Sequence, residues 1–226
     1  LPIASFTATD ACTDSTVIFA STSTISTGTI INYEWDFDND GIYEASGSTA
    51  NIASFVYTAP GTYNVKLRIT TDNSCLDSVV QSITIDPNPV AAFTFTDVCE
   101  DSTVTFTSTS TITTGGTIVS HEWDFDNDGI FEVSGITTDQ VFTVAGTYSV
   151  SLLVTSDNGC HDTLTQTIEI FPNPVAAFTF TDVCEDSTVT FTSTSTIATG
   201  GTIVSHEWDF DNDGIFEVSG ITTDQV

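Results

Sequence analysis

The strongest constraint on this chain is that its sequence repeats. Residues 87–141 and 172–226 are identical except at one position, where Thr113 corresponds to Ala198. Tryptophans recur at 35, 123 and 208, about 85 residues apart. A fixed period of this length indicates tandem copies of one folding unit. We therefore expect three repeats, at 1–87, 88–172 and 173–226.

The third repeat is expected to contain only the N-terminal part of a unit. Val226 corresponds to Val141, so the counterpart of 142–171 does not follow it, and the chain begins without methionine. We therefore expect the sequence to be a piece of a longer array.

The second repeat shows the alternating pattern of half-buried β-strands. Helical periodicity is absent over any useful length, and Val104 and Phe106 alternate with outward threonines. Short strands are predicted at 91–96, 103–110, 117–125, 130–134, 140–142, 147–155 and 164–170. About seven strands, with a buried tryptophan on the third, are typical of an immunoglobulin-like β-sandwich.

The third predicted strand should turn one face towards the core. Val119, His121, Trp123 and Phe125 alternate along it and are expected on that face. His121 replaces Tyr33 of the first repeat, and His206 does so in the third. We interpret both histidines as partly buried structural residues.

Two separated motifs resemble the PKD (polycystic kidney disease) domain family. The first is Trp-Asp-Phe with an acidic glycine loop. The second is Ala-x-Gly-Thr-Tyr-x-Val in the first repeat and Gly-Thr-Tyr-x-Val followed by Asn-Gly-Cys in the second. In the second repeat the matching residues are Trp123, Asp124, Phe125, Asp128, Gly129, Gly146, Thr147, Tyr148, Val150 and 158–160. The usual family loop reads Trp-Asp-Phe-Gly-Asp-Gly, so the loop in this chain is longer and more acidic.

The resemblance implies both a fold and a function. PKD domains are β-sandwiches that act as spacers or interaction modules in extracellular proteins. The cysteine-bearing version is similar to those in surface adhesins and secreted enzymes of gliding bacteria that use type IX secretion.

Each acidic loop is a candidate calcium site. Alternate carboxylates occupy positions 1, 3 and 5 of an EF-hand-like loop, with glycine at 6, an isoleucine carbonyl at 7 and glutamate at 9. The candidate ligands are Asp36, Asp38, Asp40, Ile42 and Glu44, then Asp124, Asp126, Asp128, Ile130 and Glu132, then Asp209, Asp211, Asp213, Ile215 and Glu217. Position 12 is Gly135 and not glutamate, so weak binding is expected, with Kd about 0.1–1 mM. The alternative is an ordinary Asp/Asn/Gly turn.

Charge excludes several classes of partner. The formal net charge is −29, and Lys66 and Arg68 are the only basic residues besides histidine. Nucleic-acid binding requires neutralised phosphates, and anionic membrane surfaces repel such a chain.

The sequence contains no apolar run of 18 residues and therefore no candidate transmembrane helix. We also expect no enzymatic activity, because no catalytic constellation has suggestive spacing.

The five cysteines recur at fixed places, which favours an oxidising, extracellular setting over zinc binding. They are Cys12, Cys75, Cys99, Cys160 and Cys184. Pairing within repeats would join Cys12 to Cys75 and Cys99 to Cys160. In an immunoglobulin-like sandwich these positions lie at opposite ends, about 20 Å apart, whereas a disulfide needs Cα atoms within about 7 Å.

We therefore favour pairing between repeats. Cys12 would bond to Cys160, Cys99 to a later cysteine of the third repeat, and Cys75 to a preceding unit. The within-repeat alternative remains open at this point.

These features predict a structural module. We expect a stiff, acidic, calcium-binding stalk or filament in a bacterial cell-surface adhesin, whose partners are neighbouring repeats of its own or adjacent chains. The alternative is an accessory binding or spacer module of a secreted hydrolase that contacts polysaccharide or protein.

Overall fold

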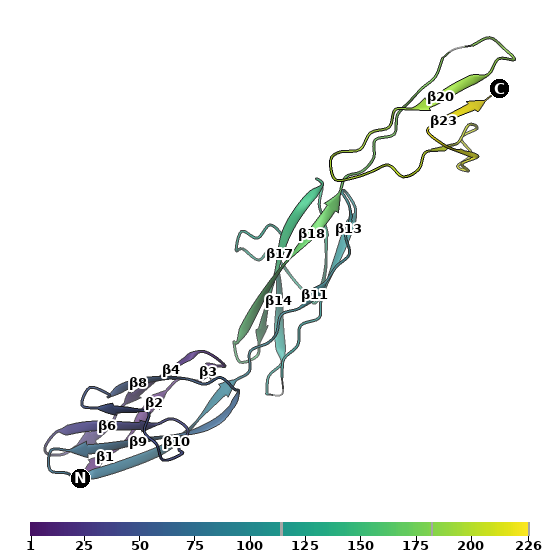
Figure 1. The fold of residues 1–226 in the computed structure, drawn as a ribbon. Coiled ribbons are helices and arrows are strands. Elements are labelled where there is room, and N and C mark those ends of the chain that lie inside the picture. Colours follow the sequence, from purple (N-terminus) through teal and green to yellow (C-terminus); the bar gives the residue numbers. More distant parts are fainter. Residues whose placement is uncertain (114, 182, 226) are drawn as a thin grey trace. The chain divides into compact units, whose positions relative to one another are not determined.

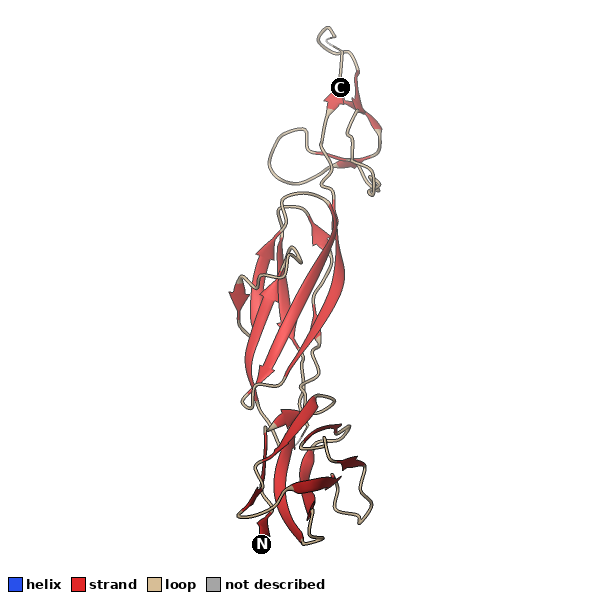
Figure 2. Cartoon of the chain, turned by 90° about the vertical axis from the view of Figure 1, so that its left-hand side faces the viewer, coloured by secondary structure: helices blue, strands red, loops and turns tan. Residues whose placement is uncertain are grey.

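The chain is an all-β protein. The computed structural model describes residues 1–113, 115–181 and 183–225, and within these ranges it contains strands and no helix (Figures 1 and 2). Each of the first two repeats forms one larger and one smaller sheet. The prediction of tandem β-sandwiches is confirmed.

The first repeat has a five-stranded and a three-stranded sheet (Figure 1). The larger sheet has the order β3-β10-β9-β6-β7, with β3 Ala11–Cys12, β10 Leu76–Asp86, β9 Gly61–Thr71, β6 Ile30–Asp36 and β7 Ala45–Gly47. The smaller has the order β2-β4-β8, with β2 Phe6–Ala8, β4 Thr16–Ser21 and β8 Ile52–Val56. A further pair joins β1 Pro2–Ile3 to β5 Thr24–Ile25.

The second repeat has the same two sheets. The larger has the order β12-β18-β17-β14-β15, with β12 Val98–Cys99, β18 His161–Phe171, β17 Gly146–Ser156, β14 Ile118–Asp124 and β15 Val133–Ser134. The smaller has the order β11-β13-β16, with β11 Phe93–Thr94, β13 Thr103–Ser108 and β16 Thr137–Val141. The strand missed from sequence is β12, which pairs in parallel with β18. Two residues are too few to show an alternating pattern.

The third repeat forms two small sheets among its described residues. One joins β19 Phe178–Thr179, β20 Val189–Ser193 and β23 Thr222–Gln225, and the other joins β21 Glu207–Trp208 to β22 Val218–Ser219. Val226, where the predicted third repeat ends, lies outside the described residues.

The chain divides into two compact units whose boundaries cut across the repeats. The first unit comprises Leu1–Ala92, Ser108–Glu122 and Leu152–Leu164, and the second comprises Phe93–Thr107, Trp123–Ser151 and Thr165–Val226. The first unit therefore combines the whole first repeat with three segments of the second, at 88–92, 108–122 and 152–164.

The tryptophans anchor the cores, as predicted. Trp35 and Trp123 are fully buried and Trp208 is 8% exposed. The ring of Trp123 packs edge-on against Phe93 at a centroid distance of 5.2 Å. Its indole N–H donates to the Gly135 carbonyl at 2.8 Å, so burial leaves no polar group unpaired.

One residue of the predicted core face is misassigned. Val119 is 63% exposed, although Trp123 and Phe125 on the same predicted face are buried. Its counterpart Ile31 is 48% exposed and lies where the register of β6 against β9 shifts. In the first repeat a bulge at this point breaks the two-residue alternation on which the prediction depended, and Val119 occupies the equivalent position of the second repeat.

His121 is a half-buried residue next to the core, as predicted. Its Nδ1 lies 2.9 Å from the hydroxyl of Ser108. Burial lowers the pKa of its imidazole below the ordinary 6.5, because the charged form is poorly solvated there.

This lowered pKa predicts a pH-dependent stability. The folded state binds the proton more weakly than the unfolded chain does. The contribution of His121 is therefore complete above about pH 6.5 and is lost as the pH falls towards the folded pKa. Replacing His121 with tyrosine, the residue at position 33, should remove this loss.

The measurement is urea unfolding of parent and His121→Tyr at about pH 7.5 and pH 5. The carboxylates common to both chains cancel in the difference between them. We expect the variant to gain stability relative to the parent as the pH falls. A constant difference would show that His121 does not titrate in this range.

Candidate metal centre

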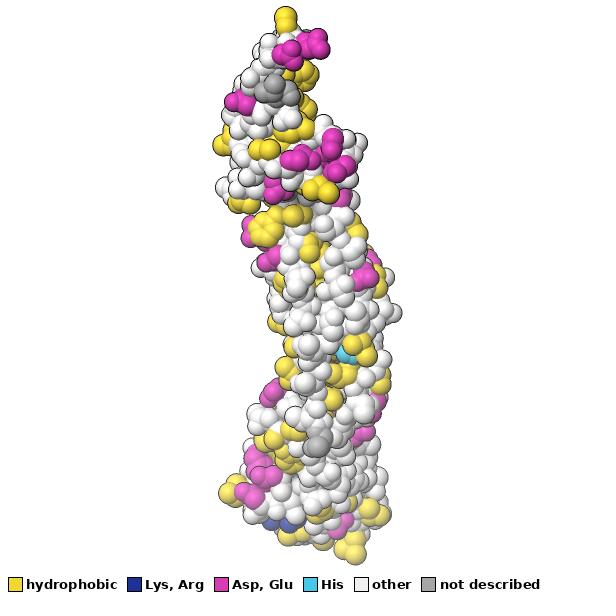
Figure 3. Space-filling model, turned by 90° about the vertical axis from the view of Figure 1, so that its right-hand side faces the viewer, with side chains coloured by type: hydrophobic (Ala, Val, Ile, Leu, Met, Phe, Trp, Pro, Cys, Tyr) yellow, Lys and Arg dark blue, Asp and Glu magenta, His cyan; other side chains and the backbone are white. Residues whose placement is uncertain are grey.

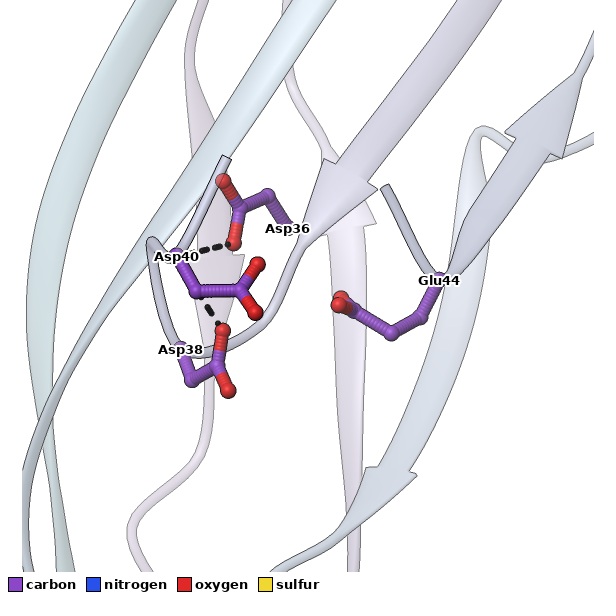
Figure 4. A group of neighbouring side chains, drawn as sticks. All are labelled: Asp36, Asp38, Asp40 and Glu44. Atoms are coloured by element: carbon purple, nitrogen blue, oxygen red, sulfur yellow. Dashed lines mark hydrogen bonds between the residues drawn. The ribbon is translucent and has the colours of Figure 1, made fainter. Parts of the chain in front are cut away.

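Each repeat places an acidic loop directly after its tryptophan strand. We define the acidic clusters as Asp36, Asp38, Asp40 and Glu44, then Asp124, Asp126, Asp128 and Glu132, then Asp209, Asp211, Asp213 and Glu217. In each cluster the four residues offer oxygen atoms that lie within 4.8 Å of one another. Figure 4 shows the four carboxylates of the first repeat converging from the loop and from Glu44 on the returning chain.

The loop backbone orients the carboxylates of the first cluster. Asp36 is buried, and its two oxygens accept hydrogen bonds from the backbone N–H groups of Asp40 and Gly41 at 3.1 and 3.0 Å. Asp38 accepts from Asp40 at 3.2 Å, and Asp40 accepts from Ile42 at 2.7 Å. Each aspartate thus has at least one carboxylate oxygen fixed by a nearby amide, and the chain curls around a common centre.

Two residues with a left-handed backbone conformation allow the loop to close. Asn39 has φ of 59° and Gly41 has φ of 96°. Asparagine tolerates the left-handed region better than most residues, and glycine enters it without a steric penalty. Asn127 and Gly129 repeat this pair in the second repeat, with φ of 57° and 91°.

Glutamate supplies the fourth carboxylate from beyond the loop. Glu44 lies just before β7, and its Oε2 accepts a hydrogen bond from the Phe37 N–H at 2.8 Å. Glu132 and Glu217 make the corresponding bonds to Phe125 and Phe210 at 3.3 and 3.1 Å. The ninth loop position thus reaches the cluster in all three repeats.

The isoleucines at position 7 of the loops expose their side chains and use their backbone groups within the loop. The side chains of Ile42, Ile130 and Ile215 are 66–67% exposed. Their N–H groups donate to the preceding loop aspartates. That their carbonyls bind a cation stays a prediction.

Gly135 has a different role from the twelfth ligand of an EF-hand. Its carbonyl accepts the indole N–H of Trp123. Position 12 therefore ties the loop to the core, and the cluster consists of four carboxylates.

A residue outside the loop also supports the second cluster, and it was missed from sequence. The Ser151 hydroxyl on β17 donates to Asn127 Oδ1 at 2.7 Å. The first repeat has Lys66 at this place. In the register of β6 against β9, Lys66 lies directly opposite Asp36. The repeat period aligns the two residues, but only the register shows that they face the loop.

The arrangement suits a hard cation. Crowded carboxylates repel one another when no cation neutralises them, and carboxylate oxygens are ligands that Ca²⁺ prefers. Acidic side chains also recur elsewhere on the face drawn in Figure 3. The structure therefore contains acidic clusters that could hold a metal ion.

One disulfide bond is present among the described residues. Cys12 and Cys160 are joined with an S–S distance of 2.01 Å and a Cα–Cα distance of 5.6 Å. Of the two connectivities left open by the sequence, this is the one between repeats. Within the described ranges Cys75, Cys99 and Cys184 carry free thiols.

Two comparisons with known proteins, one with family models and one with curated proteins, agree with each other. The family model for the PKD domain matches residues 1–87 and again 86–172. Pre-pro-metalloprotease PrtV of Vibrio cholerae is 32% identical over 155 residues, which are 68% of this chain and 16% of that protein. The chain thus spans about one sixth of the length of these curated relatives.

Two solved domains are similar in sequence to single repeats. The PKD1 domain of Vibrio anguillarum Epp is 34% identical and covers 38% of this chain and 95% of its own, with a TM-score of 0.33. The PKD1 domain of the Vibrio cholerae metalloprotease PrtV is 40% identical and covers 37% and 96%, with a TM-score of 0.32.

Proposed function

Because the chain belongs to the PKD domain family, we propose that it is a stiff, acidic, calcium-binding spacer of a bacterial cell-surface adhesin or filament. Its partners are neighbouring repeats of the same or adjacent chains. The proposal gives the chain a mechanical role and no catalytic one.

The observation that carries this proposal is the covalent bond between Cys12 and Cys160. It joins a strand of the first repeat to the turn between β17 and β18 of the second. Hydrogen bonds support the joint: Asn158 donates to the Asp86 carboxylate at 3.0 Å. Asn88 lies between Pro87 and Pro89 in the linker that joins the two repeats, and it donates to the Thr13 carbonyl at 3.0 Å. A linker held at this many points has little freedom to bend.

The extracellular setting has independent support. Disulfides persist in oxidising compartments and are rare in the cytosol. A net charge of −29 attracts cations, which suits a cation-rich medium. The part of the chain that the structure describes has no helix long and apolar enough to cross a membrane.

The test is a distance measurement between spin labels on natural thiols. Cys75 and Cys99, one in each complete repeat, are labelled in a Cys184→Ser background. We expect a narrow distance distribution that broadens when Cys12→Ser and Cys160→Ser are added, because the joint then bends. A broad distribution with the disulfide intact would reject the stiff-spacer proposal, and equally narrow distributions with and without it would show that the disulfide is not what holds the joint.

Calcium should stabilise the folded chain. A ligand that binds only the folded state stabilises it by mass action. At about 10 mM calcium, a Kd of about 0.1–1 mM gives about 1.4–2.7 kcal/mol per site. Calorimetric titration should show about three sites, one for each acidic cluster.

The matched variants separate a site from general charge. Asp126→Ala with Asp128→Ala should remove one of the three calcium equivalents. Glu122→Ala with Asp139→Ala removes the same charge outside the cluster and should leave all three. If both double variants bind calcium as the parent does, the second cluster is an ordinary acidic turn.

An accessory module of a secreted hydrolase is the second candidate. It is favoured by the similarity to PrtV, which is named a metalloprotease. Under this alternative the chain should bind polysaccharide or protein directly, and co-sedimentation with insoluble polysaccharides would detect it. The spacer proposal expects the chain to remain in the supernatant.

A further inference from the structure

Asparagine is followed directly by glycine at a single place in the sequence, Asn158-Gly159. This dipeptide lies in an exposed turn between β17 and β18, next to Cys160 of the disulfide. The joint consists of the Cys12–Cys160 bond and the hydrogen bonds beside it. Glycine has no Cβ to shield its backbone nitrogen, so that nitrogen can reach the side-chain amide of the asparagine before it. The turn therefore contains the two groups that react in deamidation.

The folded joint engages both reacting groups with other partners. The backbone N–H of Gly159, which would be the nucleophile, donates to the Ser156 carbonyl at 2.9 Å. The side-chain amide of Asn158 donates to the Asp86 carboxylate at 3.0 Å and to the Gly115 carbonyl at 3.5 Å. All five residues belong to the first compact unit. Ring closure requires both groups to leave these partners and to meet in a reactive geometry, so the closed joint opposes the reaction.

Charge at the turn opposes the reaction as well. Asp157 accepts hydrogen bonds from the Thr117 N–H at 3.1 Å and from its hydroxyl at 2.8 Å, and these bonds lower the pKa of the Asp157 carboxyl. The attack of the backbone nitrogen places negative charge on the amide oxygen, and nearby carboxylates destabilise that charge. Asp86 belongs to the linker, so its carboxylate is close only while the joint is closed.

We propose that Asn158-Gly159 is a deamidation site controlled by the joint, which protects it when closed and exposes it when open. The Gly159 nitrogen attacks Cγ of Asn158, a new C–N bond forms, and the Cγ–Nδ2 bond breaks. Ammonia leaves with the electron pair of that bond and with the proton of the Gly159 nitrogen. Water then opens the succinimide ring at either carbonyl and gives aspartate or isoaspartate.

The product prevents the joint from closing as before. Residue 158 is the hydrogen-bond donor to Asp86, and deamidation replaces this donor with a carboxylate. Two carboxylates repel each other at this distance, and the Gly115 carbonyl also loses its contact. Isoaspartate in addition lengthens the backbone next to Cys160. A joint that has once opened for long enough therefore carries a permanent covalent record.

The first repeat supplies a matched turn that lacks both features. Asn73-Ser74 corresponds to Asn158-Gly159, and the Asn73 amide donates to its neighbour Asp72 at 3.0 Å and not to a linker. Ser74 has φ of 59° and Gly159 has φ of 80°, so the turn accommodates serine in the left-handed region. The Cβ of serine shields the backbone nitrogen. Gly159→Ser is therefore a variant that preserves the turn and blocks the reaction.

The inference goes beyond the proposed spacer function, because it concerns a covalent change of the joint. The two are tested by different quantities. The spin labels report how far the joint bends, whereas deamidation is read from the mass of one peptide. A flexible joint would reject the spacer and leave the protection of Asn158 to be measured on its own.

The test is peptide mapping by mass spectrometry after incubation at neutral pH, since exchange of NH₂ for OH changes the mass of the peptide that contains residue 158. We expect Cys12→Ser with Cys160→Ser to deamidate there about tenfold faster than the parent or more, because the joint opens more easily without its bond. Adding Gly159→Ser should remove this increase. A free peptide of residues 154–162, with serine for cysteine, should react fastest. Equal rates in the parent and the double-serine variant, or in the parent and the peptide, would overturn the proposal.

The effect of the product is measured with Asn158→Asp. Cys160 is fully buried, so a joint that closes poorly exposes the disulfide more often. We expect a neutral phosphine to reduce the bond several-fold faster in Asn158→Asp than in the parent. Asn73→Asp adds the same charge to the turn of the first repeat and should leave the reduction rate unchanged. Equal reduction rates in the two variants would show that deamidation does not keep the joint open.

Discussion

Replacing Trp123 with alanine should lower the free energy of unfolding of the second repeat by about 3–5 kcal/mol. The side chain is fully buried and contacts Phe93, Phe106 and Phe125 at ring-centroid distances of 5.2, 5.8 and 6.3 Å. Truncation leaves a cavity among these rings. It also leaves the Gly135 carbonyl without the indole donor that now satisfies it.

The measurement is urea unfolding followed by circular dichroism. Hydrogen exchange of peptides from 146–156 assigns the transition to the second repeat. Val119→Ala is the matched control, because it shortens a largely exposed side chain on the same strand and should change stability by less than about 0.5 kcal/mol. Equal midpoints for Trp123→Ala and its parent would contradict the core assignment.

Removing the disulfide should cost about 2–5 kcal/mol. Cys12 and Cys160 are separated by 148 residues and lie in the same compact unit. A link across so long a loop greatly restricts the unfolded chain, so its loss increases the entropy gained on unfolding. The expected result is a lower urea midpoint for the Cys12→Ser, Cys160→Ser variant.

Two controls separate the bond from other effects of the thiols. Cys75→Ser removes a thiol that is free in the described structure and should leave the midpoint unchanged. A reducing agent should lower the midpoint of the parent but not that of the double variant. If the double variant unfolds at the urea concentration of its parent, the bond adds nothing to stability.

Much of the fold could be predicted from sequence because it depends on local patterns. The repeat period indicated how many units to expect. Alternation along 103–110 and 147–155 indicated strands, which the structure shows at Thr103–Ser108 and Gly146–Ser156. Tryptophan on a strand of this kind indicated a buried anchor.

The acidic loops could be predicted in part from the sequence for the same reason. Asp36, Asp38 and Asp40 are so close in sequence that a single turn brings them together, and the structure does so. The contact of Ser151 with Asn127 could not be predicted from the sequence, because it joins residues that are 24 positions apart on different elements.

By itself the sequence determined the repeat, the strand-rich class, the buried tryptophans and the composition of the three acidic loops. These follow from local periodicity, side-chain character and turn chemistry. Only the tertiary structure decided that Val119 points outward and that Cys12 meets Cys160. Each of these depends on a bulge, a register or a joint between distant segments, and such long-range geometry leaves no periodic signal in the chain.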